Sequence, residues 1–245
     1  MDDTEEFNER NRAFVTRMAE DERLGELTQE WLTATTRYEY SYHFTWLGRP
    51  IIQFPQDIVA TQEIIWRVRP DLIVETGIAR GGSLIFSASM LQLLGGDGLV
   101  VGVDVDIREH NRVEIERHPL AKRIRMIQGS SVDESVVRQV QSYAEGRSTV
   151  LVMLDSNHTH DHVLRELQLY ARFVTPGSYL IVYDTIVERM PDDMYPNRPW
   201  RRGDNPLTAV KEFLAQNADF EVDHEVENKL LITVAPGGYL RRIKR

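Results

Sequence analysis

The stretch that decides the fold runs Leu72-Ile-Val-Glu-Thr-Gly77-Ile-Ala-Arg-Gly-Gly-Ser83. Its apolar start, Leu72–Val74, predicts a buried strand. Its glycines predict a tight turn in which the backbone comes close to a ligand, although they could also serve only to pack a strand against a helix. A helix is expected to begin at once, at residue 83. In open parallel sheets, ligands bind outside the carboxyl ends of the strands, so this turn is the first candidate site.

The same order of strand and helix repeats along the chain. Short apolar runs bounded by Gly, Pro or acidic residues predict further buried strands, with helical segments between them. This alternation is typical of an α/β fold, a doubly wound and mostly parallel sheet with helices on both faces. The strands are predicted at Leu72–Val74, Leu99–Val103, Ile124–Ile127, Val150–Leu154, Tyr179–Val182, 219–226 and 229–235, and the helices at 55–68, 83–94, 108–117, 133–144, 160–173 and 207–216.

The first 54 residues depart from this regular pattern. Apolar positions at helical spacing over residues 5–32 predict one or two amphipathic helices. Aromatic side chains then crowd into residues 38–46. Such a density fits a satellite core or a subunit contact, and aromatic rings with polar ends also line ligand pockets. We therefore divide the chain into an N-terminal helical and aromatic extension, residues 1–54, and an α/β domain, residues 55–245.

Composition and charge narrow the classes of partner. The 245 residues include 29 Lys and Arg against 38 Asp and Glu, a net charge of −9. No nucleic acid is expected as a partner, because binding to a phosphate backbone needs a basic face. The absence of Cys excludes disulfides, thiolate metal sites and Cys nucleophiles. The acidic N-terminus lacks the apolar stretch of a signal peptide, so we expect a cytoplasmic protein with no membrane partner.

Polar residues follow the first three predicted strands. Glu75 precedes the glycine loop, where a carboxylate would repel a pyrophosphate and could pair with an ammonium group. Ala79 replaces a glycine of the dinucleotide fingerprint, which weakens a nicotinamide interpretation. Asp104 is placed to accept hydrogen bonds from ribose hydroxyls, or, like its neighbour Asp106, to cap the next helix. The turn at 128–131 offers small polar groups to an adenine edge or simply starts a helix.

These features together resemble the S-adenosylmethionine pocket of class I methyltransferases. The candidate cofactor-binding residues are Glu75, Gly77, Ala79, Arg80, Gly81, Ser83, Asp104, Ser130, Ser131 and Asp155.

The fourth and fifth strands end in Asp155 and Asp184. If these strands are neighbours, the two carboxylates face one crevice, and hard oxygen ligands suit magnesium or calcium. Three histidines alternate after Asp155, a spacing that does not converge on a tetrahedral zinc ion. His158 is placed to take a proton from a substrate hydroxyl, whereas His160 and His162 are expected on a solvated helix surface.

The string Leu154-Asp-Ser-Asn-His158-Thr-His-Asp-His-Val163, with Gly77–Ser83 and Tyr179-Leu-Ile-Val-Tyr-Asp184, resembles the rhamnosyl O-methyltransferase and cephalosporin hydroxylase family. The likeness spans roughly residues 40–240. It implies a seven-stranded, Rossmann-like methyltransferase fold, S-adenosylmethionine and magnesium as cofactors, a sugar hydroxyl as acceptor and self-association into a homo-oligomer. It also implies that Asp155 and Asp184 bind the metal and that Asp155 and His158 act in catalysis.

One position departs from that family. Its members commonly end the fifth strand in Glu-Asp, whereas this chain has Tyr183 before Asp184. A neutral phenol is a poorer ligand for magnesium, so Tyr183 predicts either a weaker metal site or a site without metal, in which its hydroxyl contacts the acceptor.

The favoured function is an S-adenosylmethionine-dependent O-methyltransferase acting on a sugar hydroxyl of a glycosylated natural product or glycan, assisted by magnesium. A catechol-type O-methyltransferase is an alternative, although that family favours Lys where this chain has His158. Another is a cephalosporin hydroxylase-like or accessory binding protein. We expect the loops at 38–50 and 185–206 to shape the acceptor pocket. Two roles are open for the arginines of these loops, binding of a phosphate-bearing sugar carrier or formation of surface ion pairs. These residues are Arg49, Arg198, Arg201 and Arg202.

Overall fold

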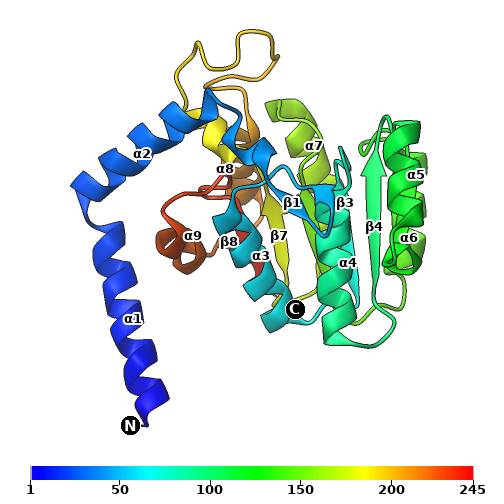
Figure 1. Cartoon of the computed structure of the whole chain (residues 1–245), viewed down its shortest axis with the longest axis horizontal. Helices are drawn as coiled ribbons and strands as arrows, with labels where there is room; N and C mark the ends of the chain where they lie inside the picture. The colour runs from blue at the N-terminus through cyan, green and yellow to red at the C-terminus, as the bar shows by residue number, and fades with distance from the viewer. Residues whose placement is uncertain (1, 245) are drawn as a thin grey trace.

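A seven-stranded sheet forms the centre of the computed structural model, which describes residues 2–244 (Figure 1). The strand order is β5-β4-β3-β6-β7-β9-β8, and only β9 runs antiparallel to its neighbours. This confirms the predicted doubly wound, mostly parallel sheet. The strands are β3 (Leu72–Thr76), β4 (Leu99–Asp104), β5 (Ile124–Gln128), β6 (Val150–Leu154), β7 (Tyr179–Val182), β8 (Phe220–Val222) and β9 (Tyr239–Arg242).

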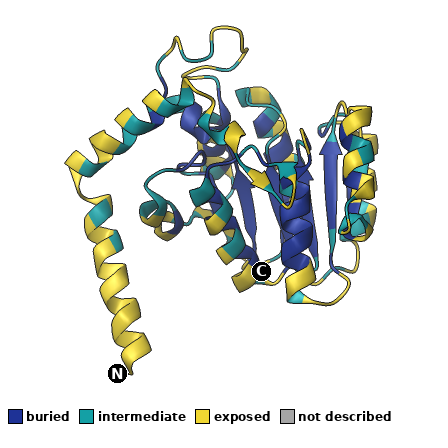
Figure 2. Ribbon diagram, viewed as in Figure 1, coloured by how far each residue is buried: buried dark blue, intermediate teal, exposed yellow. Residues whose placement is uncertain are grey.

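Helices cover both faces of this sheet. Alternate residues of a strand point to opposite faces, so Ile73 packs with one layer of helices and Val74 with the other. In Figure 2 the strands are buried almost throughout, as expected for parallel strands with both faces covered. The first layer holds α3 (Pro55–Val68), α4 (Gly82–Leu94) and α5 (Glu109–Arg117), and the second holds α6 (Glu134–Ala144), α7 (His160–Tyr170) and α8 (Pro206–Gln216).

The C-terminal segment corrects one prediction. The strand expected at 229–235 is instead the end of α9 (His224–Leu230) and a loop, and the last strand is β9. The side chain of Asp223 caps α9 by accepting a hydrogen bond from the Glu225 amide. The apolar run after α9 is fixed as a loop because buried Asp57 accepts hydrogen bonds from the Thr233 hydroxyl and the Val234 amide.

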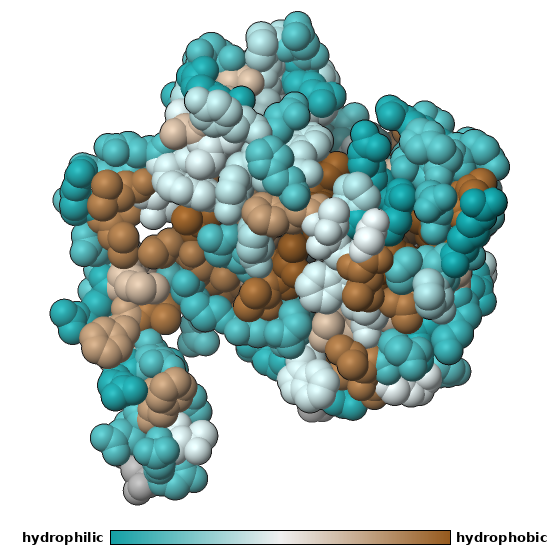
Figure 3. Space-filling model, viewed as in Figure 1, coloured by the Kyte–Doolittle hydropathy of each residue, from teal (hydrophilic) through white to brown (hydrophobic). Residues whose placement is uncertain are grey.

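The N-terminal extension consists of two helices and a hairpin. Helices α1 (Asp3–Ala19) and α2 (Glu22–Thr36) form an arm (Figure 1). Helix α1 projects from the body of the protein, whereas α2 packs on the body through buried Leu32. None of the residues described in α1 is buried, and apolar patches are visible on this arm in Figure 3. A short 3-10 turn, η1 (Tyr40–His43), leads into the hairpin of β1 (Thr45–Trp46) and β2 (Arg49–Pro50), which packs against α4. Within residues 2–244, no helix combines the length and the apolar character that crossing a membrane requires.

The sheet changes direction of winding between β3 and β6. From β3 the chain builds β4 and β5 on one side, whereas β6 and β7 lie on the other. The loops after β3 and β6 touch there, because a Cβ added to Gly77 would lie 2.1 Å from the carbonyl oxygen of Asp155. Ligands of doubly wound sheets bind at such a point.

Candidate functional site

A chamber of 720 Å³ opens at the carboxyl edge of the sheet. Its floor is formed by residues at or just after the carboxyl ends of four strands, Gly77, Asp104, Asp155 and Asp184. Its walls come from the end of α2, from η1 and from the segment 186–200. The two loops expected to shape the acceptor pocket therefore do face the same space. The aromatic side chains on these walls are Tyr40, Tyr42, Phe54, Tyr195 and Trp200.

The glycine loop after β3 is held in place by Asp104. One oxygen of its carboxylate, Oδ2, accepts hydrogen bonds from the amides of Ile78 at 2.8 Å and Ala79 at 3.1 Å. Ala79 has a positive φ of 45°, a conformation that costs free energy for a residue other than glycine. Asp104 and Ala79 both line the chamber, on the side where the sequence predicts the cofactor.

Glu75 lies behind this loop rather than on the chamber. Its side chain is buried, accepts a hydrogen bond from the Ser83 hydroxyl, and leaves Oε2 without a partner. It borders a small separate cavity together with Asp57 and Thr61. Burial raises the pKa of Glu75 to about 8, and the hydrogen bond from Ser83 offsets part of that effect. Its predicted pairing with an ammonium group therefore stays a prediction.

The other predicted cofactor residues lie around the loop. Gly81 has a φ of 81° and precedes α4 without a side-chain cap. Arg80 is exposed, and its carbonyl oxygen accepts hydrogen bonds from Arg49. Ser130 is half-buried, whereas Ser131 is buried and its hydroxyl lies 3.0 Å from Nε2 of His162.

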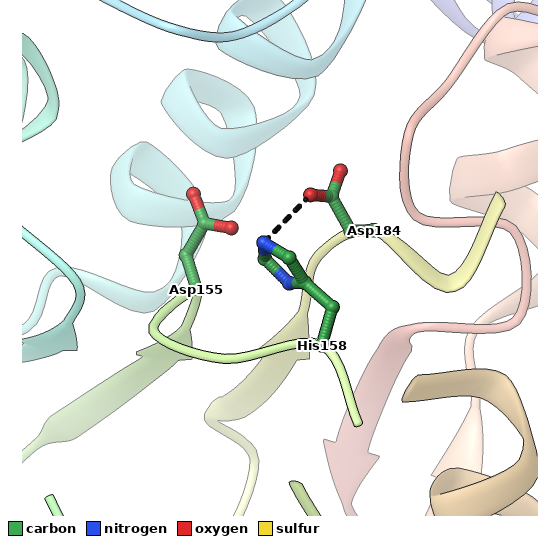
Figure 4. A group of neighbouring side chains, drawn as sticks. All are labelled: Asp155, His158 and Asp184. Atoms are coloured by element: carbon green, nitrogen blue, oxygen red, sulfur yellow. Dashed lines mark ion pairs between the residues drawn. The ribbon is translucent and has the colours of Figure 1, made fainter. Parts of the chain in front are cut away.

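Asp155, His158 and Asp184 meet at the ends of β6 and β7 (Figure 4). One ligand atom from each lies within 4.8 Å of the others. Nε2 of His158 lies 3.1 Å from Oδ2 of Asp184. Figure 4 shows the imidazole ring directed toward the space between the two carboxylates. The predicted metal ligands and the predicted base therefore form one group.

The electrostatics of this group suit a cation. Burial, followed by the charge of Asp184, raises the pKa of Asp155 well above its ordinary value. The hydrogen bond that Asp155 accepts comes from the neutral amide of Gln53, at 3.3 Å. In the described part of the chain no Lys or Arg forms an ion pair with either carboxylate. A divalent cation would compensate both charges, and carboxylate oxygens are the ligands that hard cations such as magnesium accept.

Tyr183 points away from the group. Its ring is buried, and its hydroxyl is hydrogen-bonded to that of Thr61 at 2.9 Å and donates to Sδ of Met153 at 3.8 Å. The expectation that this hydroxyl contacts the acceptor is therefore wrong. Alternation along β7 explains the difference, because Tyr183 joins the layer of α3 and α4 while Asp184, with a φ of 55°, turns into the chamber.

His160 and His162 are not simply solvated, which corrects a second expectation. Nδ1 of His160 lies 2.8 Å from the Thr208 hydroxyl, and its Nε2 lies 3.2 Å from Glu212, so this ring connects α7 with α8. His162 bonds Ser131 and Ser156. Both rings serve contacts between elements, and neither lines the chamber.

Trp200 is a neighbour of the site that the sequence did not indicate. Its ring meets that of His158 edge to face, with centroids 4.6 Å apart and planes at 88°. The guanidinium of Arg198 lies 5.1 Å from the Trp200 ring. Of the other loop arginines, Arg202 donates to the Met190 carbonyl and Arg201 pairs through its backbone with Asp204.

Comparisons with known proteins identify the family of this chain. The family model described as rhamnosyl O-methyltransferase/CmcI matches residues 38–243. The rhamnosyl O-methyltransferase of Mycobacterium tuberculosis (strain ATCC 25618 / H37Rv) is 29% identical over 203 residues, which are 81% of this chain and 78% of the relative.

Solved structures share the fold. A CmcI structure with Mg and SAM superposes with a TM-score of 0.59 at 21% identity, covering 83% of this chain and 78% of the other. An O-methyltransferase from Bacillus cereus in complex with SAH gives a TM-score of 0.53 at 16% identity, over 80% and 81% of the two chains. The chain therefore belongs to the rhamnosyl O-methyltransferase/CmcI family, and with it to the S-adenosylmethionine-dependent O-methyltransferases.

Proposed function

We propose that this protein transfers the methyl group of S-adenosylmethionine to a sugar hydroxyl of a glycosylated natural product or glycan, with the assistance of magnesium. The observation that carries the proposal is the meeting of Asp155, His158 and Asp184 beside the glycine loop at one edge of the sheet. A methyl acceptor bound at these three side chains would lie next to a cofactor bound at the loop. Transfer between two bound groups gains most of its rate from such positioning.

The cofactor is proposed at the loop that follows β3. Support comes from the related structures, of which one is described with SAM and one with SAH. Gly77, Ala79 and Asp104 border the chamber there. The carboxylate of Asp104 has oxygen lone pairs left to accept hydrogen bonds from ribose hydroxyls, besides the amide hydrogen bonds it already accepts.

The three side chains Asp155, His158 and Asp184 are proposed to hold the cation and the acceptor hydroxyl. Magnesium bound by Asp155 and Asp184 would orient the hydroxyl and lower its pKa. Nε2 of His158 lies in the space between these carboxylates, 3.1 Å from Oδ2 of Asp184. With Asp184 bound to the cation, this nitrogen would be free to take the hydroxyl proton. Trp200 packs against the ring and fixes its plane.

The side chains that line the chamber walls are evidence for a sugar as the acceptor. Tyr42, Tyr195 and Trp200 combine aromatic faces with polar ends, which suits a ring that has both C–H faces and hydroxyls. The charges on these walls are mixed, since Arg37 lies 3.5 Å from Asp193 in an ion pair. The related mycobacterial enzyme is named a rhamnosyl O-methyltransferase, which supports a deoxysugar as the first acceptor to test.

Self-association stays a prediction. Helix α1 presents exposed Phe7 and Phe14, side chains that a second copy would cover, while none of the residues described in that helix is buried in the body.

Two measurements test the proposed function. Calorimetry should show that the protein binds S-adenosylmethionine, and a mass-spectrometric assay with magnesium should show methylated product from a rhamnoside or another glycoside. A catechol serves as the control acceptor and should give no product. Failure to bind S-adenosylmethionine, or methylation of the catechol alone, would contradict the proposal.

A further inference from the structure

The hairpin of the N-terminal extension lies against the back of the glycine loop. Its strand β2 passes so close to α4 that a Cβ added to Gly82 would lie 2.1 Å from the Pro50 carbonyl oxygen. On the same hairpin, Trp46 donates from Nε1 to the Ser89 hydroxyl at 3.0 Å and packs edge to face on Phe86, both on α4. The hairpin is thus fixed to the helix that the glycine loop begins.

From this fixed hairpin, Arg49 reaches the loop itself. Its Nε and Nη2 donate to the carbonyl oxygen of Arg80 at 3.1 and 2.6 Å. Nη2 also donates to Oδ1 of Asn111, a buried side chain on α5, at 3.0 Å. Asn111 in turn donates from Nδ2 to the Ala79 carbonyl at 3.0 Å. The planar fork of an arginine allows these simultaneous contacts, which a lysine ammonium group does not reproduce.

The loop is therefore held from two sides. Asp104 accepts from the amides of Ile78 and Ala79, while Asn111 and Arg49 donate to the carbonyls of Ala79 and Arg80. These contacts fix the peptide groups on both sides of a residue whose positive φ is unfavourable without such support. The N-terminus of α4 has no side-chain cap of its own to do this.

We propose that Arg49 is a positioning residue for cofactor binding: together with Asn111 it holds residues 77–81 in the conformation that receives S-adenosylmethionine. The inference rests on the proposed function only for the identity of the ligand. It gives the extension a second role beside forming the chamber wall, since its hairpin supports the cofactor loop without touching the cofactor. A loop held in its binding conformation does not have to be ordered when the ligand binds, which raises affinity.

The test combines ligand binding with hydrogen exchange on the full chain. S-adenosylhomocysteine is titrated calorimetrically into wild type, Arg49→Ala, Arg49→Lys and Asn111→Ala. We expect the affinity to fall about 10- to 100-fold in Arg49→Ala and to stay reduced in Arg49→Lys, because the charge alone cannot replace the fork. Arg117→Ala is the matched control, since Arg117 lies exposed on α5 and its ion-pair partner there is Glu114.

Hydrogen exchange measured without ligand reports the loop directly. Peptides covering residues 77–83 should exchange faster in Arg49→Ala and Asn111→Ala, while those covering β7 stay unchanged. The double variant Arg49→Ala/Asn111→Ala should lose less affinity than the sum of the single losses, because the two side chains act as one unit.

Unchanged affinity and unchanged loop exchange in folded Arg49→Lys and Arg49→Ala would overturn the inference. A wild-type protein that does not bind S-adenosylhomocysteine would instead contradict the proposed function. In that case faster loop exchange in the variants would still support the role of Arg49 and Asn111 in holding residues 77–81.

Discussion

The two halves of the chamber floor differ in how their polar groups are satisfied. At the cofactor half, after β3 and β4, the amides and carbonyls of the glycine loop already have partners within the chain: Asp104, Asn111 and Arg49. At the acid half, after β6 and β7, Asp155 and Asp184 bring two carboxylates together, and in the described chain no Lys or Arg forms an ion pair with either.

This difference shows what each half contributes. The cofactor half has its shape before a ligand arrives, so variants there should change binding. The acid half has charge that needs a cation and a proton acceptor directed at the same space, so variants there should change turnover and metal affinity. The following predictions test this division.

The largest expected effect is at His158. Replacing His158 by Ala should lower turnover roughly 10²–10⁴-fold, the usual contribution of a general base, while S-adenosylhomocysteine binds as in wild type. Single-turnover kinetics and calorimetry measure the two quantities. His224→Ala is the control, because His224 is exposed on α9 and should leave both unchanged. Similar losses of cofactor affinity and turnover in His158→Ala would contradict the assignment of cofactor binding to one half of the floor and turnover to the other.

Asp104→Ala should act in the opposite way. The variant removes the hydrogen bonds to the loop amides and those proposed to ribose, so cofactor affinity should fall by about 1.5–3 kcal/mol, with a smaller change in the rate of the chemical step at saturation. Asp106→Ala, at an exposed neighbouring carboxylate, is the matched control. A folded Asp104→Ala protein with wild-type affinity would place the cofactor elsewhere.

Glu75 links stability to pH. Folded protein keeps the Glu75 proton up to about pH 8, whereas the unfolded chain releases it near 4.5. Between these values the folded state binds more protons, so the free energy of unfolding falls as pH rises through this window. In Glu75→Gln this part of the pH dependence should disappear from denaturant titrations. An unchanged dependence would show that Glu75 is ionised in the folded protein, and a parallel loss of cofactor affinity would support its pairing with the ammonium group.

Tyr183 gives the smallest effect. Tyr183→Phe removes the buried hydrogen bond to Thr61 and the longer one to Sδ of Met153, and should lower the free energy of unfolding by about 0.5–1.5 kcal/mol, with magnesium affinity unchanged. Tyr183→Glu should destabilise the fold rather than add a metal ligand, because the new carboxylate would be buried near Asp57 and Glu75. Tighter magnesium binding by a stable Tyr183→Glu protein would contradict this placement of the side chain.

Residues at strand ends were the most predictable part of the site. Parallel strands end at one edge of the sheet, so Asp104, Asp155 and Asp184 could be assigned to one chamber from their places after apolar runs. The fold followed from the same alternation. The second strand of the C-terminal pair could not be located this way, because the apolar run after α9 is fixed as a loop by Asp57, far away in the sequence.

Contacts between segments that are distant in the chain could not be predicted from the sequence either. Arg49 looked like a ligand for phosphate or a surface ion pair, and only the packing of the hairpin shows it bonded to the Arg80 carbonyl. Trp200 lies in an irregular segment whose sequence has no periodicity, so the sequence did not predict that its ring contacts His158. The possible contact of the Tyr183 hydroxyl with the acceptor was wrong because Tyr183 is buried in the core and its neighbour Asp184 is the residue that turns into the chamber.

The most direct test of the account is a titration of magnesium into protein saturated with S-adenosylhomocysteine, comparing wild type with Asp184→Asn. Asparagine tolerates the left-handed backbone of Asp184, so the variant should keep its fold and its cofactor affinity. We expect one magnesium site in wild type that is weakened at least about tenfold in Asp184→Asn, with S-adenosylhomocysteine bound equally by both. Equal magnesium affinity in the two proteins, or loss of cofactor binding in the variant, would contradict the account.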